Sequence, residues 1–432
     1  MKTGLYLFTN DLRLGDNPLL RQLSKQCDRI IFAYAPLHFL RPVHHSAYPR
    51  QNSSQALRAF KQQTLLALSD ELTHYGHVLY DINCFAQLTQ IIQSHKVTDI
   101  GVAFQHGWHE SFAVEKLTRR LQGITIHQAY NHTLFHKEQL PFALEDIPLT
   151  FSQFRKKIEG QVPVDPSLGK PLSLPDSVNC DLNHAVSLEH FYLQLQPWFS
   201  QSASEALTRY FATTAPSTYK QTRNALWGDN FSTGLSPWLA NGSLSARQVY
   251  SALIAYEGEH GANDSTYWIY FELLWREYFQ WLALYQKESL FSFKGMAKQS
   301  PNNTFYAERF QAWCNGNTEY PLVNALMNQL KQTGWMSNRG RQIVASCFIN
   351  ELGLDWRYGA AYFEHQLIDY DVASNYGNWQ YIAGVGADPR GGRHFNIEKQ
   401  TQMFDPDGEF TNHYHGKKVQ IPERDCVGWP QS

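Results

Sequence analysis

The apolar residues of this chain follow one pattern up to about residue 130 and another beyond about residue 198. In the first part, the short apolar runs GLYLF, RIIFAYAPL, HVLYDI and DIGVAF alternate with segments of helical periodicity, one of them from about Ser53 to His74. Such alternation is typical of a parallel sheet with crossover helices. We therefore expect a doubly wound, Rossmann-like α/β domain at residues 1–130.

The second pattern is helical. In SARQVYSALIAYE, YWIYFELLWREYFQWLALYQ and RGRQIVASCFINEL, apolar residues recur at intervals of three and four, which predicts an all-helical domain at residues 198–432. Residues 131–197 between them are rich in proline and polar turn residues and show weak periodicity. This stretch is predicted to be a long connector.

Charge and cysteine spacing exclude several classes of protein. The formal net charge is −2, so a protein that coats nucleic acid is excluded, although a local binding patch is not. No GxGxxG follows the first predicted strand, which disfavours a dinucleotide-binding dehydrogenase. The six cysteines form no CxxC pair, and no apolar run is long enough for a membrane span. Without a signal-peptide pattern, we expect a cytoplasmic protein with reduced thiols and no metal.

Three different functional groups share one helical face in ELLWREYFQWL. Glu272, Trp275 and Arg276 lie three and four residues apart, so a carboxylate, an indole and a guanidinium project together. This arrangement fits a ligand site, and it also fits an exposed ion pair beside a buried tryptophan.

A second polar face is predicted in TGWMSNRGRQIVAS. Asn338, Arg341 and Gln342 lie on one side of this helix, while Arg339 projects elsewhere. The stretch has a net positive charge, which fits either an anionic ligand or a solvated surface.

Two further segments carry clustered polar groups. In FSTGLSPW, hydroxyls at Ser232 and Thr233 precede a predicted helix, an arrangement that binds phosphate or simply caps the helix. In LIDYDVASNYGNWQY, Asp369 and Asp371 stand close to Asn375 and to a glycine, which suits close approach to a large ligand.

Together these segments resemble, in order and spacing, the FAD-binding domain of the photolyase and cryptochrome family. The opening YLFTNDLRLGDNPLL is similar to the start of the family's antenna domain. The resemblance covers nearly the whole chain and is weakest at residues 40–60 and in the connector. It implies an antenna domain at 1–130 and an FAD-binding domain at 198–432.

The resemblance implies an FAD folded into a U-shape within the helical domain. Arg341 and Asp369 match an ion pair beside the isoalloxazine, and Asp371 matches an acid at its pyrimidine edge. Asn375 matches the residue that faces flavin N5, where an amide favours the fully reduced flavin. The implied FAD-binding residues are Tyr219, Ser232, Thr233, Leu235, Ser236, Asn338, Arg341, Asp369, Asp371 and Asn375.

The resemblance also implies two further functions for this domain. Trp379, Trp356 and Trp313 match a relay that carries electrons from the surface to photoexcited flavin. A second set of residues matches a pocket for a flipped cyclobutane pyrimidine dimer and its phosphates. This set is Arg223, Glu272, Trp275, Asn338, Arg339, Gln342 and Tyr381.

Two positions point to one branch of the family. Many duplex-repairing photolyases have Met and Trp where this chain has Gln342 and Tyr381, and these two residues with GVGADPRGGRHFNI resemble cryptochrome DASH. A weaker apolar grip leaves less binding energy for unpairing a duplex. We therefore expect light-driven repair of cyclobutane dimers, preferentially in single-stranded DNA, by electron transfer from excited reduced FAD, in a monomer with no membrane partner.

Two alternatives remain open at this stage. One is a blue-light photoreceptor or transcriptional regulator without repair activity on the same fold. The other is a synthetase-like nucleotide-binding α/β protein with a helical appendage. The resemblance further implies a folate antenna, methenyltetrahydrofolate, held by an acid of an FHxE segment; in FQHGWHES, however, Gly107 stands at that position and Glu110 lies three residues further on.

Overall fold

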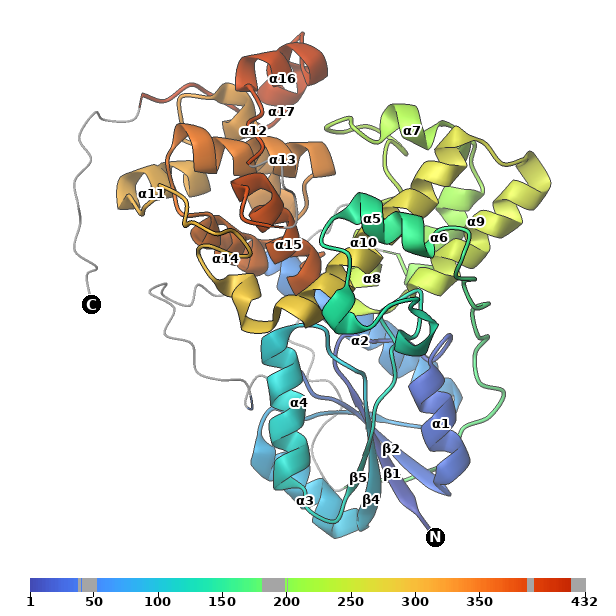
Figure 1. The fold of residues 1–432 in the computed structure, drawn as a ribbon. Coiled ribbons are helices and arrows are strands. Elements are labelled where there is room, and N and C mark those ends of the chain that lie inside the picture. The colour runs from blue at the N-terminus through green and yellow to red at the C-terminus, as the bar shows by residue number, and fades with distance from the viewer. Residues whose placement is uncertain (38–39, 41–52, 181–198, 200, 387–391, 421–432) are drawn as a thin grey trace.

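The computed structural model describes residues 1–37, 40, 53–180, 199, 201–386 and 392–420 (Figure 1). The end of the predicted connector and residues 387–391 of the GVGADPRGGRHFNI segment lie outside the described residues. The N-terminal part is a sheet with helices, and the C-terminal part is helical. Within the described residues, no helix combines the length and the apolar character that a membrane span requires.

The sheet is parallel, with the strand order β3-β2-β1-β4-β5, and β6 pairs with β2. The strands are β1 (Thr3–Phe8), β2 (Arg29–Tyr34), β3 (Leu79–Asp81), β4 (Val97–Val102), β5 (Thr125–His127) and β6 (Asp176–Ser177). β1 is fully buried and central, as its continuous apolar sequence predicts.

Helices cover both faces of this sheet. They are α1 (Pro18–Gln26), α2 (Gln55–His74), α3 (Phe85–His95) and α4 (Trp108–Arg120). Because neighbouring side chains of a strand point to opposite faces, Leu5 and Leu7 of β1 join the core under α3 and α4. Tyr6 and Phe8 join the core under α1 and α2. The predicted doubly wound α/β fold, followed by a helical domain, is confirmed.

The helical part is built around α10, whose 23 residues make it the longest helix in the described part of the chain. α10 contacts α5, α7, α9 and α15. The helices are α5 (Phe151–Ile158), α6 (Ala203–Phe211), α7 (Tyr219–Thr222), α8 (Ser236–Asn241), α9 (Ala246–His260), α10 (Asp264–Gln286), α11 (Ala307–Asn315), α12 (Pro321–Thr333), α13 (Asn338–Ser346), α14 (Trp356–Gln366), α15 (Val372–Ala383), α16 (Ile397–Phe404) and α17 (Glu409–His413).

Part of the predicted connector is a packed helix. α5 begins after the N-cap Thr150, whose side chain accepts a hydrogen bond from the backbone of Gln153. Phe151, Phe154 and Ile158 are buried in the core of the helical domain. Their spacing of three and four residues was the sequence signal for this helix. The domain limits at residues 130 and 198 stay predictions.

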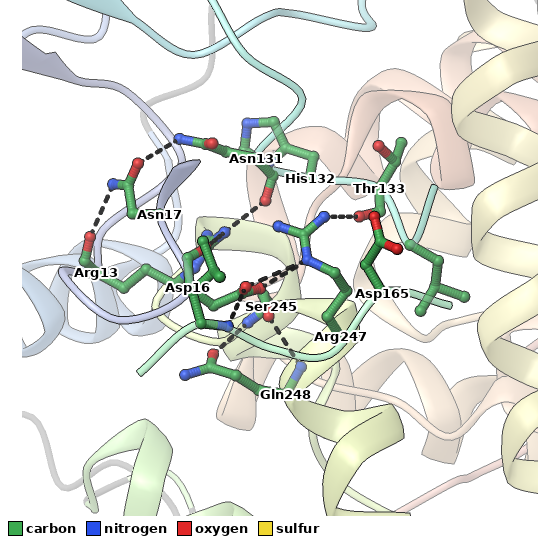
Figure 2. Close-up of polar contacts among 12 residues, drawn as sticks. Arg13, Asp16, Asn17, Asn131, His132, Thr133, Asp165, Ser245, Arg247 and Gln248 are labelled. Atoms are coloured by element: carbon green, nitrogen blue, oxygen red, sulfur yellow. Dashed lines mark hydrogen bonds and ion pairs between the residues drawn. The ribbon is translucent and has the colours of Figure 1, made fainter. Parts of the chain in front are cut away.

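A buried ion pair connects the two domains. The guanidinium Nε of Arg247, on α9, donates to both carboxylate oxygens of Asp16, at 3.2 and 3.1 Å, and Nη1 donates to the carbonyl of Thr133 (Figure 2). The side chains of Asp16 and Arg247 are 0% and 2% exposed. Beside them, Arg13 donates to the carbonyl oxygen of Gly242 at 2.8 Å. We call Asp16 and Arg247 the interdomain pair.

Candidate functional site

A cavity of about 510 Å³ lies in the helical domain, a volume typical of a ligand pocket. Its walls come from α7, α8, α9, α10, α13, α14, α15 and the loop before α8. Most of the site residues expected from the sequence line it. These are Tyr219, Arg223, Ser232, Thr233, Leu235, Ser236, Glu272, Trp275, Asn338, Arg341, Gln342, Asp369, Asp371, Asn375, Trp379 and Tyr381.

One wall of the cavity carries an ion pair. Arg341 Nη2 donates to both carboxylate oxygens of Asp369, at 3.0 and 2.7 Å, and its Nε donates to the carbonyl of Met336. The hydroxyl of Ser236 donates to Asp369 at 2.6 Å. Because the Asp369 side chain is only 2% exposed and fully engaged, this carboxylate fixes the guanidinium in one orientation.

The second acid, Asp371, is held by a residue that the sequence analysis did not single out. Gln280 Nε2 donates to both oxygens of Asp371, at 2.8 and 2.9 Å. Asp371 also caps α15 by accepting the backbone N–H of Ser374 at 2.7 Å. Gln280 is buried in the middle of an apolar helix, and such a polar residue needs a partner. A glutamine in the middle of an apolar helix was the sequence signal that could have identified Gln280 as a site residue.

Asn375 and Trp379 lie along the adjoining face of α15. The amide of Asn375 donates to the carbonyl of Ala360 at 3.0 Å, which leaves its second N–H and its oxygen for the cavity. The indole of Trp379 packs on α14 so closely that a Cβ atom at Gly359 would collide with it. Only glycine at position 359 permits this approach.

Hydroxyls and backbone amides gather in the loop before α8. Ser232 Oγ accepts from the N–H of Gly234, and Thr233 Oγ1 accepts from the N–H of Leu235, both at 3.4 Å. Gly234 has φ +63°, a left-handed conformation that glycine adopts readily. The loop thus exposes hydroxyl groups to the cavity that can bind phosphate oxygens.

At another part of the cavity, Glu272 forms an ion pair with Arg223. The resemblance had assigned both to the pocket for the dimer and its phosphates, and the structure joins them in a pair. Burial raises the pKa of Glu272, and the positive charge of Arg223 opposes that rise. The Arg223 guanidinium also lies over the ring of Trp268, 4.4 Å from its centroid, in a cation–π contact.

Two aromatic rings stand nearly perpendicular in the cavity wall. The ring centroids of Trp275 and Tyr381 are 6.1 Å apart, with an interplanar angle of 72°. Phe151 of α5 stacks on Trp275 at 3.8 Å and 14°. Arg393 donates to the Tyr381 hydroxyl at 3.1 Å. The connector helix therefore supports the indole from outside the cavity.

Arg339 lies outside the cavity wall. Its Nη2 donates to the side-chain oxygen of Asn224 at 3.1 Å. The guanidinium is placed over the rings of Phe395 and Phe404, at 5.5 and 5.0 Å. Burial and the nearby charge of Arg223 lower its pKa, so the two arginines lie in one electrostatic environment.

The three expected relay tryptophans do not form the expected sequence of contacts. The rings of Trp313 and Trp379 are in contact, with centroids 6.2 Å apart. Among the described residues, Trp356 makes a ring contact with Tyr376 and with neither tryptophan. The structure does not support Trp313 as the surface end of the relay, because its indole is 0% exposed and a surface donor must meet solvent.

Comparisons with known proteins agree with this geometry. Residues 4–173 match the model of the DNA photolyase family, and residues 268–429 match the FAD binding domain of DNA photolyase. The chain is 46% identical to the cryptochrome DASH of Idiomarina loihiensis (99% of this chain, 96% of the relative) and 47% identical to that of Vibrio parahaemolyticus (99% and 97%). The chain belongs to the cryptochrome DASH family. The synthetase-like alternative is thereby excluded.

Solved structures of the photolyase and cryptochrome family show the same fold. A cryptochrome DASH relative is known from Synechocystis, and a Synechocystis cryptochrome structure superimposes with a TM-score of 0.87 and 36% identity, over 96% of this chain and 88% of that one. A class III photolyase from Agrobacterium tumefaciens gives a TM-score of 0.80 and 25% identity, over 96% and 86%.

The residues of the cavity fit FAD. The ion-paired Arg341, the hydroxyls of Ser232 and Thr233, and apolar walls at Phe363 and Leu367 supply the polar and apolar surfaces that a large dinucleotide requires. The match to an FAD-binding family model over α10 to α17 supports the same cofactor. The roles of single residues toward FAD are proposals, developed below.

In the segment expected to hold a folate, the position of the expected acid is taken by Gly107. The carboxylate of Glu110, in the first turn of α4, lies over Gly107, so that a Cβ atom at residue 107 would collide with it. The methyl group of Val372, at the start of α15, lies 2.7 Å from the same Cβ position. An acid is thus present beside residue 107, although it comes from position 110.

Proposed function

We propose that this cryptochrome DASH uses FAD and light to repair cyclobutane pyrimidine dimers and that it prefers single-stranded DNA. One observation carries the proposal: the cavity lined by the Arg341–Asp369 pair and Asn375 is also lined by Trp275, Tyr381 and the other candidate dimer-contacting side chains. A flipped pyrimidine dimer and a flavin can therefore meet in one cavity. Reduced FAD, when bound and excited, supplies one electron to the dimer and receives it back.

The side chains at the cavity define what each would do in repair. The perpendicular rings of Trp275 and Tyr381 offer apolar surface to the dimer. Glu272, oriented by Arg223, offers a carboxylate to the polar edges of the pyrimidines. The amide of Gln342 lines the same cavity. Gln342 and Tyr381 make weaker apolar contacts with the dimer than the Met and Trp that many duplex-repairing photolyases have at these positions. Less binding energy is therefore available to offset the few kcal/mol of base unpairing in a duplex.

The decisive experiment measures light-driven repair with chemically reduced protein. Oligonucleotides that contain one cyclobutane dimer are offered as single strands and as intact duplexes, in light and in darkness. We expect repair in light alone, and much faster repair of the single strand. Equal rates on both substrates would refute the strand preference, and no repair of either would favour the photoreceptor function.

Variants of the pocket separate binding from chemistry. Glu272→Gln should weaken binding of the dimer and leave the flavin absorption spectrum unchanged. The double variant Gln342→Met with Tyr381→Trp should raise the repair rate on duplex DNA, because stronger apolar contacts with the dimer offset the free energy cost of base unpairing. An unchanged duplex rate would show that grip does not limit repair.

The salt dependence of DNA binding tests the arginines. Arg223→Ala and Arg339→Ala should each reduce the slope of log K against log salt by about one phosphate contact. Arg357→Ala is the matched control, since Arg357 lies on α14, pairs with Asp355 and does not line the cavity. An equal change in all three variants would place the DNA elsewhere.

A folate antenna, methenyltetrahydrofolate, is part of this proposal, with Glu110 as the acid that serves in place of one at position 107. Adding the folate should produce an absorption band beside that of the flavin, and Glu110→Gln should weaken its binding. No band at saturating folate would exclude this antenna. A cytoplasmic location fits the scattered cysteines, and a monomeric state is proposed with it.

A further inference from the structure

The tryptophan relay proposed from the sequence lacks its surface member in this structure, since Trp313 is fully buried and does not contact Trp356. Trp379 lines the cavity and packs on Gly359, one helical turn beyond Trp356. An electron can therefore pass between α14 and α15, two helices in direct contact. The relay then needs a donor that refills Trp356.

Tyr376 is the aromatic residue in contact with Trp356 within the described part of the chain. Their ring centroids are 6.3 Å apart, and the rings meet edge to face at 78°. Tyr376 lies on α15 next to Asn375 and is 7% exposed. Electron tunnelling falls steeply with distance, so Tyr376 is the favoured donor to Trp356.

The hydroxyl of Tyr376 donates to a carboxylate oxygen of Glu364 at 3.2 Å. Glu364 is half-buried and so reaches solvent. Burial, with the carboxylates of Glu364 and Glu110, raises the pKa of Tyr376, so the phenol keeps its proton and remains the donor of this hydrogen bond at neutral pH. A phenol that can pass its proton to a carboxylate is much easier to oxidise than one that cannot.

We propose that Tyr376 is the terminal electron donor of the relay and that Glu364 accepts its proton. This inference rests on the proposed FAD site and on Trp379 and Trp356. One electron leaves Trp379 for photoexcited oxidised FAD, Trp356 refills Trp379, and Tyr376 refills Trp356. The phenolic proton moves to Glu364 in the last step. The products are a neutral tyrosyl radical, a protonated Glu364 and an FAD with one added electron, so charge and protons balance.

Loss of the proton explains why the charge separation between the flavin and this end of the relay would persist. A tryptophan radical cation can take its electron back directly. The tyrosyl radical can do so only when the proton also returns from Glu364, which slows recombination. Tyr362 lacks this device: its ring contacts Trp313 at 5.5 Å, but its hydroxyl donates to the backbone carbonyl of Cys314, which is not a proton acceptor at neutral pH.

The test is flash spectroscopy on the full protein with oxidised FAD and no added reductant, with paramagnetic resonance to identify the radical. We expect a tyrosyl radical that grows as the tryptophan radical decays, more slowly in deuterated water. Tyr376→Phe should abolish that signal, and recombination should become several-fold faster. Glu364→Gln keeps a hydrogen-bond acceptor without a proton acceptor, so it should slow radical formation several-fold. Tyr362→Phe is the matched control and should behave like the natural protein.

Several results would overturn the proposal. They are the absence of a tyrosyl radical in the natural protein, its persistence in Tyr376→Phe, or its loss in Tyr362→Phe. Should Tyr376→Phe fail to fold, Glu364→Gln and the deuterium effect decide. Repair by the natural protein with chemically reduced flavin is measured separately. If the natural protein forms the tyrosyl radical but repairs no dimers, the proposed function alone is refuted. If it repairs dimers but forms no tyrosyl radical, this inference alone is refuted.

Discussion

Breaking the interdomain pair tests how the two domains are held together. In Asp16→Asn, the carboxylate charge is removed but the side-chain shape is kept, and Asn tolerates the left-handed conformation at this position, φ +47°. Arg247 then remains 2% exposed without its counter-charge, next to the second buried guanidinium of Arg13. In Arg247→Met, the opposite charge is removed, and a side chain of similar length fills the space.

The size of the effect follows from burial. Two unit charges about 4 Å apart attract by about 4 kcal/mol at an effective dielectric constant of about 20. Removing one member of a fully buried pair costs about 3–5 kcal/mol, because the other charge stays desolvated. Removing both costs much less. The double variant of Asp16 and Arg247 should therefore be more stable than either single variant.

Hydrogen exchange of the native protein is the suitable assay, because two domains need not unfold in one step. Peptides that cover residues 131–135 and 240–250 report opening of the interface, and a double-mutant cycle gives the coupling energy. Single variants that each change the opening free energy by less than about 1 kcal/mol, as exposed pairs do, would refute the reasoning. A double variant equal to the sum of the singles would refute it as well.

Three further results are expected. Asp369→Ala and Arg341→Ala should each release FAD on gel filtration, and full occupancy in both would place the flavin elsewhere. Trp379→Phe should slow photoreduction of oxidised flavin, since phenylalanine is harder to oxidise than indole; an unchanged rate would remove Trp379 from the relay. Burial raises the pKa of Glu277 from 4.5 to about 7. Its contribution to stability is therefore fully present below pH 4.5 and is lost as the pH rises through 7. Glu277→Gln should reduce the change in melting temperature between these two pH values.

Helical periodicity was sufficient to predict one wall of the site. Asn338, Arg341 and Gln342 were placed on one face of a helix from their spacing, with Arg339 elsewhere, and the cavity is lined by the first three and not by Arg339. This works because the angle between residues of a helix depends on the local backbone alone. The strands and crossover helices of the first domain were predictable for the same reason.

Contacts between distant segments were not predictable in this way. Glu272 and Arg223 are 49 residues apart, and Gln280 and Asp371 are 91 residues apart. Their pairing depends on how α7, α10 and α15 pack, which no local pattern encodes. Trp313 shows the same limit, since a relay role depends on solvent exposure, and spacing in the sequence says nothing about whether packed helices cover an indole.

The packing of α10 links the cavity to the interface between the domains. Glu272 and Trp275 line the cavity, while Glu277 accepts hydrogen bonds from the backbone N–H groups of Leu134 and Phe135, at 2.7 and 3.3 Å. The same helix therefore positions the dimer-binding side chains and holds the chain that leaves the first domain. Because packed interiors transmit displacements rather than absorbing them, a shift of the first domain should reach the cavity through α10. The position of the first domain relative to the cavity would then depend on α10 as well as on the interdomain pair.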